Sequence, residues 1–145
     1  MQTLEEEFAV DAPLEGVYRA ISDVGAIGTV VAGVKTVEVL GPLEAAWTVE
    51  VRAGMIAQTL KLQGRVTEQQ PPHHLAFAAA GRNVAVTGTV TLAPAEAGGT
   101  LCRVAVQAEV TGRLAPLIEL VSRTTQKQLI AETIDNFRRR MAEVT

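Results

Sequence analysis

Few groupings of side chains in this sequence suggest a catalytic site, and the first candidate group is the single cysteine. Cys102 lies in the alternating run TLCRVAVQAEV, on its apolar side, with no base beside it in sequence. A thiol needs a neighbouring base or positive charge to become a reactive thiolate. We therefore expect Cys102 to be a buried packing residue and not a nucleophile.

Two histidines follow a pair of prolines at the start of an expected strand. His73 and His74 are adjacent, and adjacent residues of a strand point to opposite faces, so they cannot readily bind one metal ion. No cluster of cysteines or carboxylates accompanies them. We expect histidines at a rim and no metal site.

Glu6 is the carboxylate with a potential binding role. It alternates with Glu5 and Glu7 and shares a face with Leu4 and Phe8. If this face is the inner one, Glu6 points into the protein and can hydrogen-bond a ligand; otherwise it lies at a solvated rim. The pattern leaves both open.

Composition excludes several classes of protein. The 145 residues carry a net charge of -3, which argues against a nucleic-acid groove. The N-terminus lacks the pattern of a signal peptide, and no apolar run approaches the roughly 20 residues of a membrane span. One cysteine fits a reducing compartment. We expect a single domain over residues 1–145, in the cytoplasm.

Hydrophobic periodicity predicts an α+β fold with a curved, seven-stranded antiparallel sheet. A strand with period two precedes DAPLEGVYRAISD, which has helical spacing, and a long helical pattern runs from Thr111 to Met141. Glycine and proline breaks separate the segments between them. The six later strands are VKTVEVL, AAWTVEVRA, IAQTLKLQGRVTE, HHLAFAAA, NVAVTGTVTLAP and GTLCRVAVQAEV.

One face of the expected sheet is apolar, and the closing helix must cover it. Gly64 and Gly88 lie within strands, where glycine marks a bulge or a sharp bend. The inward residues are mostly small, so the space under the helix is either a ligand pocket or a tightly packed core. The candidate ligand-binding residues are Glu6, Phe8, Trp47, Val49, Leu60, Leu62, Phe77, Val86, Val104, Val106, Leu117, Val121 and Thr125.

The closing helix carries two apolar stripes. The first, assigned to the sheet, comprises Leu114, Ile118, Val121, Thr125 and Leu129. Phe137 is expected near the sheet edge, whereas Ile130, Ile134 and Met141 are expected partly outward, as an interface. The alternative is a curved helix that buries every one of them. Three arginines, residues 138–140, suit the end of the helix dipole or an anionic partner.

The order of elements resembles the helix-grip fold of the START-like (SRPBCC) superfamily, with two short helices after the first strand. FAVDAPLEGVYRAISDV, AGVKTVEVLG, LQGRVTEQQPPHHLAF and VTGTVTLAPAEAGGTLCRVAVQAEVTGRLAPL are similar to successive blocks of the CoxG-like family, which is associated with carbon monoxide dehydrogenase. The resemblance implies a pocket for a lipid or a quinone and, in some members, attachment of a molybdenum hydroxylase to the membrane. The family's Pro-Gly-Cys is absent, because residues 32–34 are Ala, Gly and Val.

We therefore predict a protein that sequesters a lipophilic small molecule, with no cofactor and no catalytic residue. The alternative is a polyketide cyclase or aromatase that uses the same cavity, for which Tyr18, Glu6 and His73 are the available acid and base groups. Predicted partners are the apolar ligand, a molybdenum hydroxylase or a second copy of the chain, and the inner membrane face by peripheral contact.

Overall fold

The computed structural model describes residues 2–53, 55–112 and 123–144. It confirms the predicted order of strand, two short helices, six strands and C-terminal helix. The elements are β1 (Gln2–Val10), α1 (Leu14–Ser22), α2 (Val24–Gly28), β2 (Val34–Gly41), β3 (Glu44–Ala53), β4 (Ile56–Gln70), β5 (His74–Gly81), β6 (Val84–Pro94), β7 (Thr100–Val110) and α4 (Arg123–Val144).

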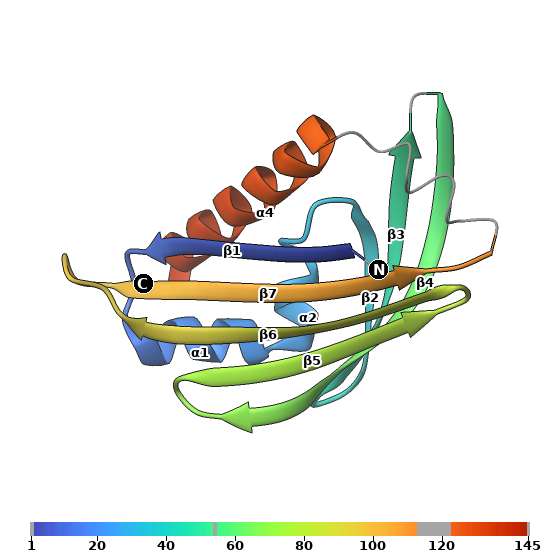
Figure 1. Cartoon of the computed structure of the whole chain (residues 1–145). Coiled ribbons are helices and arrows are strands. Elements are labelled where there is room, and N and C mark those ends of the chain that lie inside the picture. The colour runs from blue at the N-terminus through green and yellow to red at the C-terminus, as the bar shows by residue number, and fades with distance from the viewer. Residues whose placement is uncertain (1, 54, 113–122, 145) are drawn as a thin grey trace.

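The seven strands form one antiparallel sheet in the order β1-β7-β6-β5-β4-β3-β2. Strands β2 to β7 form a meander, and β7 also pairs with β1. In Figure 1 the sheet curves strongly, so that β3 and β4 rise steeply from the level of β1, β7 and β6, and α4 lies over the concave side. The curvature creates a trough that one helix covers.

The strand glycines play a different part from the one expected. Pairing of β4, β5 and β6 runs through Gly64 and Gly88 without a shift, and the irregularity in β4 falls between Val66 and Glu68. A bulge, one of the two alternatives expected at these glycines, is therefore wrong. A Cβ at Gly88 would lie 2.3 Å from Cζ of Phe77, so this glycine leaves room for the ring of the residue opposite it.

The short helices pack against one end of the trough. Val17 and Tyr18 of α1 are buried, and the Tyr18 hydroxyl donates a hydrogen bond to the His74 carbonyl at 3.0 Å. The side chain of Asp23 caps α2 by accepting a hydrogen bond from the Ala26 amide at 3.1 Å. The first contact fixes α1 against β5, and the second stabilises the start of α2.

The end of the trough at α1 holds the most deeply buried side chains. Its most deeply buried side chains are Val17, Leu92, Thr100, Cys102 and Met141. The Thr100 hydroxyl is satisfied by the Ala12 carbonyl at 2.8 Å, as a buried polar group requires. We call this region the packed end of the trough.

The apolar face of α4 differs from the expected one. Met141 is 1% exposed, and Ile130 and Ile134 are half-buried on the side that faces the sheet, so the expectation that these three residues lie partly outward is wrong. The spacing of Ile130, Ile134, Phe137 and Met141 places all four on one stripe, which is turned toward the sheet and α1. Of the other stripe, residues 114, 118 and 121 and the side chain of residue 125 lie outside the described part, and Leu129 is 41% exposed.

Helix α4 is attached through its second half. Thr133 Oγ1 accepts a hydrogen bond from the Ala32 amide at 2.9 Å, and Asn136 Nδ2 donates to the Val30 carbonyl at 3.1 Å. Arg138 Nε donates to the Ala9 carbonyl at 3.1 Å. Within the described residues, no helix has the length and apolar character needed to cross a membrane.

Candidate ligand cavity

A cavity of about 460 Å³ lies between the concave face of the sheet, α2 and α4. Its volume falls in the range of small-molecule sites, about 300–1,000 Å³. The predicted residues that line it are Glu6, Phe8, Trp47, Phe77, Val86, Val104 and Val106. Strand alternation thus brings seven predicted side chains from β1, β3, β5, β6 and β7 to one space.

Other predicted residues lie elsewhere. Val49, Leu60 and Leu62 are half-buried but do not line the cavity, because the β3–β4 hairpin continues past it. Residues 117 and 121 and the side chain of residue 125 lie outside the described part of the chain. A role for any predicted residue in ligand binding stays a prediction.

Sequence reasoning missed one wall of the cavity. Ile21 and Ile27 of the short helices and Val31 of the following loop line it, as do Ile130 and Ile134 of α4. The signal was present for α4, where the regular spacing of Ile130, Ile134 and Phe137 marks one face. The loop after α2 has no periodicity that could reveal which of its side chains turn inward.

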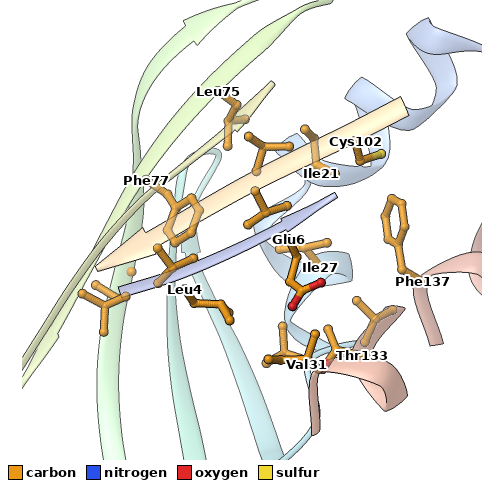
Figure 2. Close-up of a pocket in the computed structure, with 18 of the residues that line it drawn as sticks. Leu4, Glu6, Ile21, Ile27, Val31, Leu75, Phe77, Cys102, Thr133 and Phe137 are labelled. Carbon is orange, nitrogen blue, oxygen red and sulfur yellow. The ribbon is translucent and has the colours of Figure 1, made fainter. Parts of the chain in front are cut away.

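The pairing of residues across the strands sets the shape of the sheet side of the cavity, which we call the floor. Leu4 pairs with Val106, Val106 with Gly88, and Gly88 with Phe77. The missing side chain at Gly88 lets the Phe77 ring lie across the strand, and Phe77 is among the labelled side chains at the cavity in Figure 2. Val86 and Val106 beside it present short side chains, so the floor is hollow here.

Glu6 brings a carboxylate into these apolar surroundings. Its partner across the sheet is Val104, and in Figure 2 its carboxylate projects from β1 into the cavity. Glu7, one residue later, points to the outer face, where it accepts a hydrogen bond from Arg103 at 2.8 Å. The alternation of β1 therefore separates one inner carboxylate from its exposed neighbours.

The other polar groups around the cavity are occupied or covered. Thr133 Oγ1 donates to the Leu129 carbonyl at 2.8 Å in addition to its bond from Ala32. The indole nitrogen of Trp47 is buried without a hydrogen-bond partner in the described structure and packs against Gly28, where a Cβ would lie 2.8 Å from it. Arg65 also borders the cavity, but it is exposed.

The groups proposed for acid–base chemistry do not converge. Tyr18 bonds to a backbone carbonyl and His73 Nδ1 lies 3.3 Å from the Leu92 carbonyl; neither lines the cavity with Glu6. Burial raises the pKa of the Tyr18 hydroxyl, which keeps it protonated. Across the described ranges, no three His, Cys, Asp or Glu residues are grouped to hold a metal ion.

Cys102 lines the cavity at the packed end and is 1% exposed. Burial raises the pKa of its thiol from 9.0 to about 11, against the opposing effect of the positive charge of Arg138. A buried thiol with a raised pKa is a poor nucleophile. The geometry is that of a packing residue.

We expect the Cys102 thiol to react slowly with iodoacetamide. At pH 8 a shift of the pKa from 9.0 to about 11 lowers the thiolate fraction about 100-fold, so the folded protein should react at least about 100-fold more slowly than the protein in urea. The check is the alkylation rate followed by mass spectrometry. Equal rates in the two states would show an accessible thiol whose pKa is not raised by burial.

A comparison with known proteins identifies the family of this chain. Residues 1–142 match the model of the family described as polyketide cyclase / dehydrase and lipid transport. No curated protein matches the chain in sequence.

Solved structures with low sequence identity share the fold. A conserved protein from Geobacillus kaustophilus is 18% identical with a TM-score of 0.81, covering 98% of this chain and 96% of that one. A START superfamily protein from Mycobacterium smegmatis is 15% identical with a TM-score of 0.75, covering 99% of this chain and 99% of that one. The Zhui aromatase/cyclase from Streptomyces sp. R1128 is 14% identical with a TM-score of 0.67, covering 97% of this chain and 93% of that one. With the family match over residues 1–142, the chain belongs to the polyketide cyclase / dehydrase and lipid transport family.

Proposed function

We propose that the chain binds an apolar small molecule in the cavity and holds it out of water. The observation that carries this proposal is a space of about 460 Å³ with almost wholly apolar walls. Burial of apolar ligand surface is favourable by roughly 25 cal/mol per Å², whereas empty apolar space forgoes packing contacts. Membership of a family whose description includes lipid transport supports the same reading.

Binding without catalysis is favoured over cyclase chemistry. Cyclisation needs acid and base groups within hydrogen-bond reach of the reacting atoms. In the described lining of the cavity, Glu6 is the one carboxylate and no histidine or tyrosine stands beside it. The predicted wall residues supply area, and a polar group fixes the orientation of the ligand.

Filling the cavity should abolish binding. Val106→Trp places a large ring in the hollow floor, where Val106 faces Gly88 across the sheet. We expect the Kd of a neutral apolar fluorescent probe, N-phenyl-1-naphthylamine, to rise at least about 10-fold, with little change in Tm because the ring enters an existing void. Fluorescence titration and thermal unfolding measure both.

Gln107→Trp is the matched control. Gln107 is the next residue of β7 and is exposed on the outer face, so the same ring there should leave probe binding unchanged. If Val106→Trp instead unfolds the protein, the space is already filled and the proposal fails. Val86→Trp, on the neighbouring strand, repeats the test from β6.

Recruitment of a molybdenum hydroxylase, to which the CoxG-like resemblance points, is a separate prediction. It requires an outer surface of the protein and is independent of what fills the cavity. Copurification of such an enzyme with the tagged protein from its own host tests it.

A further inference from the structure

The run of three glutamates at residues 5–7 gives β1 two different charge environments. Glu5 and Glu7 are exposed on the outer face, and Glu7 is paired with Arg103. Glu6 is half-buried on the inner face and stands opposite Val104. One strand thus carries carboxylates in water on one side and a carboxylate facing an apolar cavity on the other.

In the described part of the chain, no group forms a hydrogen bond or ion pair with the Glu6 carboxylate. Arg103 is on the outer face with Glu7. Arg138 donates to the Ala9 carbonyl and lies 4.0 Å from Asp135, with its guanidinium 5.9 Å from the centre of the Phe8 ring. Both arginines that contact residues of β1 therefore have other partners, and Arg65, on β4 at the border of the cavity, is exposed.

The hydroxyl of Thr133, which lines the same cavity and is labelled in Figure 2, is committed as well. Its oxygen donates to the Leu129 carbonyl and accepts from the Ala32 amide. The indole N–H of Trp47 is covered by Gly28 and stands on β3, five strands from β1 in the sheet order. The protein, as described, supplies no donor to Glu6.

An unpaired carboxylate in apolar surroundings is costly, and the cost falls when a donor arrives with the ligand. We propose that the ligand presents a hydrogen-bond donor, an ammonium or hydroxyl group, to the Glu6 carboxylate, with its apolar body against the floor at Phe77 and Val106. Ligands ending in a carboxylate or phosphate are disfavoured by charge repulsion. This inference rests on the proposed binding of an apolar molecule.

The test uses four probes with one ring system. These are 2-methylnaphthalene, 2-naphthylmethanol, 2-naphthylmethylamine and 2-naphthoate, measured by displacement of N-phenyl-1-naphthylamine at pH 7. In the wild type we expect the amine to bind at least about 10-fold more tightly than the naphthoate, and the alcohol more tightly than methylnaphthalene. In Glu6→Gln the ratio of amine to naphthoate affinity should fall about 10-fold or more.

Glu5→Gln is the matched control, because it removes the same charge from the same strand on the outer face. It should leave the order and the ratios of the four probes unchanged. Equal ratios in wild type and Glu6→Gln, or equal effects of the two variants, overturn the inference. If methylnaphthalene binds in that case, the proposed function still stands; if none of the four probes binds, the proposed function fails and the inference with it.

A measurement without ligand checks the premise. Because the carboxylate lacks a partner, Glu6→Leu should raise the Tm of the free protein while it abolishes the preference for the amine. A lowered Tm would mean that the folded protein satisfies Glu6 itself, which would overturn the inference. Glu5→Leu, on the outer face, should leave the amine preference unchanged.

Discussion

Gly99→Ala is expected to destabilise the protein by about 3 kcal/mol or more, which lowers Tm by about 10 °C. Gly99 ends the turn between β6 and β7 with a φ of +81°, and a Cβ there would lie 2.5 Å from the carbonyl oxygen of Val10. Neither group can move freely, because Val10 pairs with Thr100, whose buried hydroxyl bonds to Ala12. Chemical unfolding in urea measures the loss.

The neighbouring glycine supplies the control. Gly98 has nearly the same φ, +90°, but no atom of the described residues lies within 4 Å of a Cβ built on it. Gly98→Ala should therefore lower the free energy of unfolding only by the cost of holding alanine in a left-handed conformation, about 1–2 kcal/mol. The difference between the two variants isolates the close approach of the turn to β1. Equal losses would show that backbone conformation alone explains both.

Phe137→Ala is expected to cost about 3–5 kcal/mol. The ring of Phe137 is 5% exposed and meets the ring of Phe8 edge to face, with centroids 6.4 Å apart and planes at 81°. Its removal opens a hole where α4 docks on β1, beside the hydrogen bond from Arg138 to Ala9. Urea unfolding at pH 7 gives the change in stability.

Leu129→Ala serves as the comparison within the same helix. Leu129 is 41% exposed, so its truncation should cost less than about 1 kcal/mol. Similar losses in the two variants would mean that α4 docks through a broader face than the stripe ending at Phe137 and Met141. A loss from Leu129→Ala alone would contradict the observed orientation of the helix.

Most of the sheet could be predicted from the sequence because its strands are half-buried. Each strand alternates apolar and polar residues, and the alternation fixes both the strand and its inner face. It correctly placed Phe8, Phe77 and Val104 on the cavity side. The alternation could not show where along a strand the cavity ends. Trp47 and Leu62 pair across two strands and both belong to the apolar side of the pattern, but only Trp47 lines the cavity.

The orientation of α4 was harder to predict because two stripes competed. The expected phase was carried forward from residues 114–129, and this set Ile130, Ile134 and Met141 outside. The shorter stripe through Phe137 and Met141 decides the packing of the described helix, since its members meet Phe8 and the region of Gly16 on α1. In the described part of the helix, the stripe of large residues near the anchored end determines which side packs against the sheet.

Glu6 illustrates what spacing can and cannot reveal. Its position in the alternation of β1 placed Glu6 either on the inner face or at a rim. The structure shows that β1 runs past α2 and α4, which brings the carboxylate to the cavity. The occupation of Thr133 by backbone groups 101 and 4 residues away in sequence had no sequence signal. Contacts between distant segments determine which polar groups remain available.

The packed end and the hollow floor occupy different parts of the same strands. On β7, Cys102 belongs to the packed end and Val106 to the floor, and on β6 the corresponding residues are Leu92 and Val86. A substitution at the floor therefore changes the shape offered to a guest molecule without touching the side chains that hold α1 and α4 in place. During evolution, single substitutions at the floor can therefore change which ligand the cavity accepts, before any compensating substitution is needed in the packed end.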